Sequence, residues 1–271
     1  MRLMREIRCF PTARSTGRDV VNSWAGSPGE SPLGPFWVLR ATVEGPVDER
    51  TGYLCDIKTL DTVLREVVAP LVYERARAAP GGFAAPAGAL IDALAAGDSH
   101  CKRPLELVSI QWCVSPHLSF TANRGEKHMV SVTQSFEFSA AHRLYCDELS
   151  PEENRRVFGK CANPNGHGHN YVLEVTVSGD PARADSDAPH AATGRVVDLE
   201  FLQRTVRERV IARFDHKHLN LDCEEFTSLN PSVENIARVI WDRLAGAFDG
   251  CRLTNVRVWE TPKTYAEFDG T

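Results

Sequence analysis

Apolar and polar residues alternate along two stretches of the chain, residues 130–143 and 171–177. Such alternation is typical of β-strands, in which successive side chains point to opposite faces. Elsewhere the apolar residues recur at the spacing of a helix that buries one face. In one such segment they are Leu199, Leu202, Val206 and Val210, and in another they are Val233, Ile236, Val239, Ile240 and Leu244. The pattern therefore predicts a fold of the α+β class.

Segments in the second half of the chain have counterparts in the first half. Residues 38–45 match 172–179, residues 51–57 match 193–199, and residues 107–116 match 253–262. Asp56 and Asp198 occupy equivalent positions, where each is expected to cap the start of a helix. Self-similarity of this kind indicates a tandem duplication. We therefore predict two modules, residues 1–127 and 128–271, each with the order strand, strand, helix, helix, strand, strand.

Composition limits the functions open to the chain. Its 271 residues, 42% of them hydrophobic, suffice for one to two domains. The net charge is −5 and no cluster of basic residues occurs, so no electrostatic footprint for nucleic acid is expected. The N-terminus lacks the apolar stretch of a signal peptide and no apolar run could span a membrane, which predicts a cytoplasmic protein. The eight scattered cysteines are expected to be mostly buried, reduced thiols.

Three histidines lie where two predicted strands could bring them together. His167 and His169 are two residues apart at the start of one strand, so both rings point to the same face. His142 lies at the end of the other strand and is the natural third ligand. Three neutral imidazoles suit zinc and leave its fourth position open, which favours a catalytic site over a structural one. The spacing also allows iron or cobalt.

Other candidate residues are ambiguous when read alone. Cys161 lies in a polar loop a few residues before His167, where a nearby cation would favour the thiolate and make it a usable base. The neighbours Asp215 and His216 could equally form an ordinary surface ion pair, and Glu260 could be a solvated strand end. His218 has no role that the pattern assigns.

Several motifs, in this order, resemble the 6-pyruvoyltetrahydropterin synthase family, which includes the 6-carboxytetrahydropterin synthases. They are Phe138 to Arg143, Gly159 to Cys161, Asp215 to Leu219, Pro231 to Asn235 and Val258 to Thr261. The likeness extends from about Val130 to Gly270. It implies the tunnelling fold, in which a four-stranded antiparallel sheet carries a helix pair on one face and modules join edge to edge into barrels.

The resemblance also implies a function, a zinc-dependent lyase acting on 7,8-dihydroneopterin triphosphate. His142, His167 and His169 would hold one zinc ion, and Cys161 would act as a base together with the Asp215–His216 pair. Glu260 would anchor the pterin ring, and magnesium could help to hold the triphosphate. The product would be 6-pyruvoyltetrahydropterin or, in the other branch, the 6-carboxy compound with release of acetaldehyde. The five residues between Cys161 and His167 look like the pyruvoyl branch.

The first module lacks these chemical groups when the two copies are superimposed by sequence. Arg14, Leu33, Pro35 and Val114 stand opposite His142, His167, His169 and Glu260. We therefore expect the first module to be structural. Since single-module relatives form stacked rings of three modules, the resemblance favours a homotrimer over a dimer that closes one ring. A non-catalytic pterin- or purine-binding assembly is the alternative of a different class.

Overall fold

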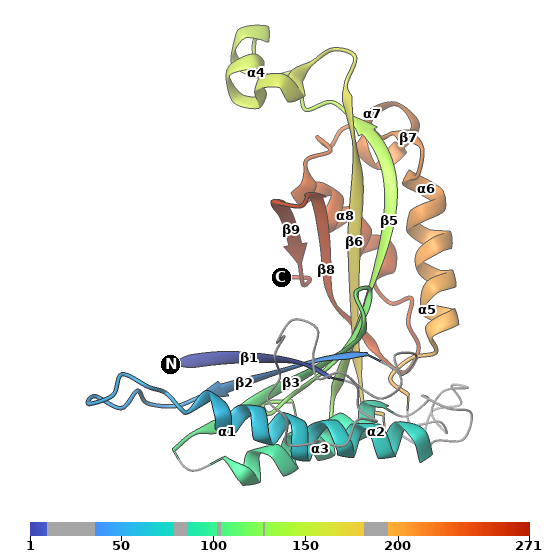
Figure 1. Ribbon diagram of the computed structural model, residues 1–271. Helices are drawn as coiled ribbons and strands as arrows, with labels where there is room; N and C mark the ends of the chain where they lie inside the picture. The colour runs from blue at the N-terminus through green and yellow to red at the C-terminus, as the bar shows by residue number, and fades with distance from the viewer. Residues whose placement is uncertain (10–35, 79–85, 102–103, 127, 182–194) are drawn as a thin grey trace. The chain divides into compact units, whose positions relative to one another are not determined.

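The computed structural model describes residues 1–9, 36–78, 86–101, 104–126, 128–181 and 195–271 (Figure 1). The chain divides into two compact units: a first unit of residues 1–133 and 178–196, and a second unit of residues 134–177 and 197–271. Arg14, Leu33 and Pro35, the expected counterparts of the three histidines, lie outside the described residues. None of the described helices has the length and apolar character that a membrane crossing requires.

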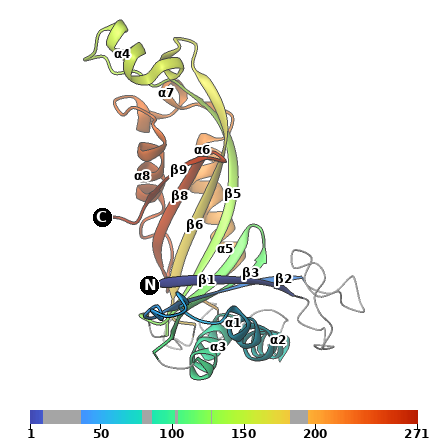
Figure 2. The ribbon, with the colours of Figure 1, turned by 60° about the vertical axis from the view of Figure 1, so that its left-hand side comes forward.

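The first unit is an antiparallel sheet with helices on one face (Figure 2). Its strands, in their order across the sheet, are β1 (Arg2–Cys9), β2 (Trp37–Glu44), β3 (Glu106–Ser115) and β4 (Leu118–Asn123). The helices are α1 (Ile57–Thr62), which continues through a π-helical turn η1 (Val63–Val68) into α2 (Ala69–Ala78), and α3 (Pro86–His100). Alternate residues of β2 are buried, beginning with Trp37, whose ring meets that of Trp112 edge-on at 4.6 Å.

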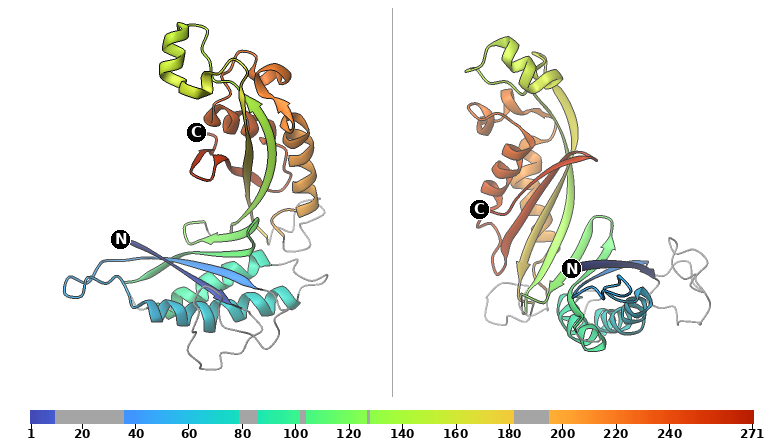
Figure 3. Two further views of the ribbon diagram at one scale, coloured as in Figure 1. Left: turned by 45° about the horizontal axis from the view of Figure 1, so that its top comes forward. Right: turned by 90° about the vertical axis from the view of Figure 1, so that its left-hand side faces the viewer.

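The second unit has a similar plan, with helices beside a curved sheet (Figure 3). The neighbouring strands are β5 (Val130–His142), β6 (His167–Gly179), β8 (Arg252–Thr261) and β9 (Thr264–Phe268), and a short β7 (Lys217–His218) pairs parallel to β5. The long helices are α5 (Leu199–Val206), which continues through η4 (Arg207–Ile211) into α6 (Ala212–Phe214), and α8 (Val233–Leu244). Short helical segments are α4 (Pro151–Phe158), η2 (Gly159–Ala162), α7 (Leu219–Asp222) and η5 (Glu224–Phe226).

Local sequence signals explain where the helices begin. The side chains of Asp56 and Asp198 accept hydrogen bonds from backbone N–H groups of α1 and α5, which confirms both predicted caps. Ser232 caps α8 in the same way. Helix α4 was not predicted, although Ser150 and Glu153 form a reciprocal capping box that the sequence displays. In the first unit two strands are followed by helices and then by two strands, whereas in the second α4 and η2 separate β5 from β6, and β7, α7 and η5 lie between α6 and α8.

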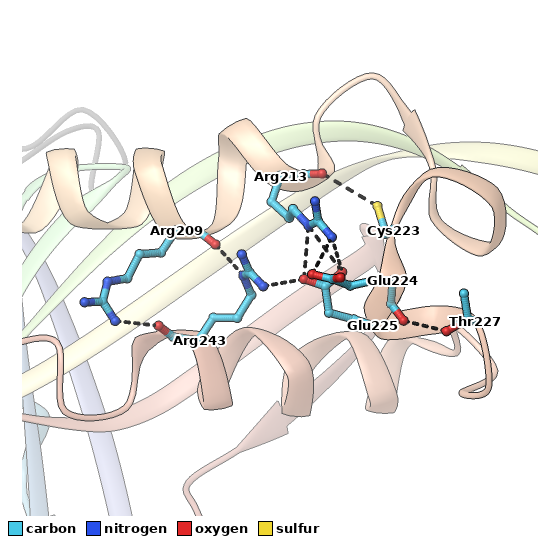
Figure 4. A network of polar contacts seen from close by, with 7 residues as sticks. All are labelled: Arg209, Arg213, Cys223, Glu224, Glu225, Thr227 and Arg243. Atoms are coloured by element: carbon cyan, nitrogen blue, oxygen red, sulfur yellow. Dashed lines mark hydrogen bonds and ion pairs between the residues drawn. The ribbon is translucent and has the colours of Figure 1, made fainter.

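A network of ion pairs ties the end of α6 to α8 and η5 (Figure 4). The Arg213 Nε lies 3.1 Å from the Glu225 carboxylate, which also pairs with Arg243. Burial raises the pKa of Glu225, but hydrogen bonding from Arg213 and the charges of both arginines outweigh it, so the pKa lies below its ordinary value. The network therefore holds α6 in place, and Asp215 is the residue that follows this helix.

Candidate metal centre and catalytic residues

The three predicted histidines come together at one end of the second unit's sheet. His142 is the last residue of β5, and His167 and His169 lie near the start of β6. One ring nitrogen from each residue lies within 4.8 Å of the others, and the Nε2 atoms of His142 and His167 are 3.2 Å apart. Since β6 begins at His167, the period of the strand places His167 and His169 on one face, as predicted.

The hydrogen bonding of this cluster fits a bound cation. His142 Nδ1 lies 2.7 Å from the carbonyl oxygen of Pro231, so Nδ1 carries the proton and Nε2 presents a lone pair to its neighbours. His169 Nε2 is buried without a hydrogen-bond partner. Burying such a nitrogen costs free energy unless something compensates, and a metal ion at the centre of the cluster would do so. The residues therefore fit the zinc that the resemblance implies.

Burial also keeps the imidazoles in the form that binds metal. Burial, helped by the charges of the neighbouring histidines and opposed by the hydrogen bond to Pro231, lowers the pKa of the fully buried His142 to about 4. The pKa of His167 is lowered mainly by burial and then by His169. Neutral imidazole, and not imidazolium, is the ligand for a metal ion, so the site needs no proton release from His142 at neutral pH.

A tight turn positions His167. The N–H of Gly166 donates to the carbonyl of Asn163 at 2.9 Å, and the Asn163 side chain accepts from the N–H of Asn165. Gly166 has φ +68°, a left-handed conformation that glycine adopts without strain. A Cβ there would lie 2.9 Å from the backbone oxygen of His142, so the turn also needs glycine for lack of space.

Cys161 lies in η2, between helix α4 and this turn. Its carbonyl accepts a hydrogen bond from the N–H of Leu144, and the residue is half-buried. Burial raises the pKa of Tyr171, and the charges of Glu260 and Cys161 raise it further. Leu144 lies two residues after His142, so its hydrogen bond to Cys161 holds the cysteine's loop beside the end of β5 that carries a metal ligand. All eight cysteines are free, and Cys161 is not among the buried ones.

The predicted Asp215–His216 pair is formed. Asp215 Oδ2 lies 2.8 Å from His216 Nδ1, and Asp215 Oδ1 accepts from the N–H of Ser139 on β5. The Ser139 N–H lowers the pKa of Asp215 most, and His216 lowers it further, so the carboxylate stays charged and can orient the imidazole. His216 adopts φ 58° and its side chain is 83% exposed. Among the described residues, no contact joins His216 to Cys161.

Glu260, which was expected to anchor the pterin ring, also lies close to two of the three histidines. Its Oε1 is 3.5 Å from His142 Nε2 and 3.6 Å from His169 Nε2. Glu260 lies at the end of β8. Its closeness to the histidines depends on how β8 aligns with the neighbouring strands, which the sequence of β8 alone does not show. A group in this place could accept hydrogen bonds from a ring bound beside the metal or could approach the metal itself.

Sequence reasoning missed other residues at the centre. Tyr171 is fully buried, and its hydroxyl has no hydrogen-bond partner. The Pro231 carbonyl, which orients His142, belongs to the motif from Pro231 to Asn235, to which the sequence assigned no contact with a histidine. A polar residue among the apolar positions of β6 was the available signal for Tyr171, whereas no sequence signal exists for a backbone carbonyl.

Comparison with known proteins identifies the second half of the chain. A family model described as 6-pyruvoyl tetrahydropterin synthase matches residues 131–271. The human 6-pyruvoyl tetrahydrobiopterin synthase is 40% identical over 152 residues, which cover 55% of this chain and 98% of the human protein. The 6-carboxy-5,6,7,8-tetrahydropterin synthase of Haemophilus influenzae is 26% identical, with 52% of this chain and 99% of that protein covered.

A solved structure of the Caenorhabditis elegans 6-pyruvoyl tetrahydropterin synthase is 35% identical, covering 53% of this chain and 96% of that one with a TM-score of 0.47. The family match spans over half the chain and includes all the candidate site residues. Because residues 131–271 match this family model, the chain belongs to the 6-pyruvoyl tetrahydropterin synthase family.

Proposed function

We propose that the protein is a zinc-dependent lyase that converts 7,8-dihydroneopterin triphosphate to 6-pyruvoyltetrahydropterin with loss of triphosphate. The observation that carries this proposal is the convergence of three imidazoles with a half-buried cysteine nearby. Relatives up to 40% identical are named as synthases of this type, which supports the same activity here. Each residue role below belongs to the proposal.

In this reaction the ring is reduced while the side-chain hydroxyls are oxidised, so no external redox reagent is needed. Bound zinc would supply Lewis acidity that polarises the side-chain hydroxyls and acidifies the adjacent carbon-bound proton. The Cys161 thiolate takes a proton from the side chain, and His216, oriented by Asp215, returns one. Glu260 accepts hydrogen bonds from the ring and fixes its orientation. Magnesium would help to hold the triphosphate.

The 6-carboxytetrahydropterin synthase activity is the alternative, because the two branches share a substrate. A single assay separates them: purified, zinc-loaded protein is incubated with dihydroneopterin triphosphate and the pterin products are resolved by chromatography. We expect the pyruvoyl compound. The carboxy compound together with acetaldehyde would assign the other branch, and pterin binding without turnover would support the non-catalytic assembly.

We also propose that residues 1–127 form a non-catalytic module. The first unit has four antiparallel strands and a helix pair, as a duplicate of the catalytic module would. Val114, which stands opposite Glu260 in sequence, lies in β3 and offers no carboxylate. Three chains could then stack a catalytic ring on an inert one. Light scattering should give a mass near three times 30.0 kDa, whereas a fully active monomer or dimer would contradict the trimer.

Replacing Glu260 with glutamine tests its proposed role directly. The amide presents a donor to the ring's own donors, so we expect the KM for the pterin to rise by about 10- to 100-fold, equivalent to roughly 1.5–3 kcal/mol for hydrogen bonds to a charged group. Zinc content should be unchanged. Steady-state kinetics and elemental analysis of the same preparation check both points. Loss of zinc from E260Q would instead show that Glu260 helps to hold the metal.

A further inference from the structure

His218 lies beside the metal centre, although it is not one of the three ligands. Strand β7 pairs His218 with Ala141, the residue before His142 on β5. The His218 N–H donates to Asp222 Oδ2 at 2.7 Å, which holds the backbone at this point. The ring is half-buried, and its Nδ1 is buried without a hydrogen-bond partner. Packing, more than hydrogen bonding, therefore accounts for the place of the ring.

The ring of His218 packs against the turn that precedes His167. A Cβ on Gly166 would lie 2.8 Å from His218 Nε2 and 2.9 Å from the carbonyl oxygen of His142. The Cα of Gly166 is therefore enclosed between a side chain and a strand end. His167 is the next residue along the chain, and its ring centroid lies 4.5 Å from that of His142.

A short segment of chain beside β5 connects the metal centre to the Asp215–His216 pair. Both Asp215 and His216 bond to the backbone of Ser139 on β5, and β7 follows immediately, alongside Ala140 and Ala141. Ser139 lies three residues before His142, which is about 10 Å along a strand. His218 is thus the last side chain in a short segment that begins with the proposed proton-transfer pair.

We propose that His218 is a positioning residue of the metal centre, whose ring supports Gly166 and so holds His167 in place for metal binding. The proposal rests on the proposed zinc site and extends it to a residue outside the ligand set. A ring that only filled space would affect stability alone, whereas a positioning ring must also change the affinity for metal. Residues that orient metal ligands without touching the metal typically contribute about 10- to 100-fold in affinity.

The test is the zinc dissociation constant of His218→Ala, measured by competition with a chelator. We expect an affinity about 10- to 100-fold weaker than that of the wild type. H218Q, which replaces much of the ring's volume, should recover most of the loss. His117→Ala, at an exposed position in the turn between β3 and β4, is the matched control and should bind zinc as the wild type does. Circular dichroism and thermal unfolding of the metal-free proteins show whether each variant folds.

A double-mutant cycle with Gly166→Ala tests the contact itself. G166A alone should weaken zinc binding, because its Cβ meets both the ring and the His142 carbonyl. Removing the ring relieves one of these contacts, so the combined variant should lose less than the product of the two single losses. Wild-type affinity in H218A, or independent losses in the cycle, would overturn the positioning role. A wild type that binds no zinc would instead overturn the proposed function.

Discussion

Replacing His169 with alanine is expected to remove the affinity for zinc almost completely, and turnover with it. The remaining pair, His142 and His167, would leave the metal with two protein ligands instead of three. Residues that merely orient ligands contribute about 10- to 100-fold, so loss of a ligand should cost on the order of 10³-fold or more in affinity. Competition with a chelator and elemental analysis measure this, with the product assay run on the same protein.

His169 is the preferred position for this test because its side chain is 19% exposed, whereas His142 is fully buried. Truncating His142 would leave a cavity and an unpaired Pro231 carbonyl, so its effects on fold and on metal would be mixed. The wild type should contain one zinc per chain. Full zinc content in H169A would show that the three-histidine cluster is not the site, and two equivalents in the wild type would reveal a second site.

The parts of the site that sequence could predict are those that depend on local periodicity. The alternation of a strand places His167 and His169 on one face whatever the rest of the fold does, and the structure confirms their approach to His142. Helix caps are equally local, which explains why the predicted caps at Asp56 and Asp198 are confirmed. Helix α4 was not predicted, although its capping box of Ser150 and Glu153 is a local signal that the sequence displays.

Contacts between distant segments could not be predicted in the same way. The distance from Glu260 to the histidines depends on how β8 aligns with its neighbour β6, and no pattern within β8 encodes that alignment. The hydrogen bond from Ser139 to Asp215 spans 76 residues of sequence, and it turns an apparently ordinary surface pair into an anchored one. No sequence pattern assigns a role to His218, because the role proposed for it depends on its approach to Gly166 in space.

Replacing Cys161 with alanine should separate chemistry from metal binding. The thiol is not among the three ligands, so zinc content and folding should remain near those of the wild type. Loss of a positioned base typically slows turnover by about 10²- to 10⁴-fold, and we expect kcat to fall within that range. Because Cys161 should act on the carbon-bound proton and not on the ring, the dissociation constant for the pterin should change much less than kcat.

Cys146 provides the matched control for this variant. It is another free, half-buried cysteine of the second unit, and its known hydrogen bonds to Asn154 use only backbone atoms. Cys146→Ala should therefore turn over substrate at nearly the wild-type rate. Equal losses in C146A and C161A would point to a general effect of thiol removal. Wild-type kcat in C161A with zinc still bound would remove Cys161 from the mechanism. The base would then be sought among other groups around the histidines, such as the Glu260 carboxylate, whose Oε1 lies 3.5 Å from His142 Nε2.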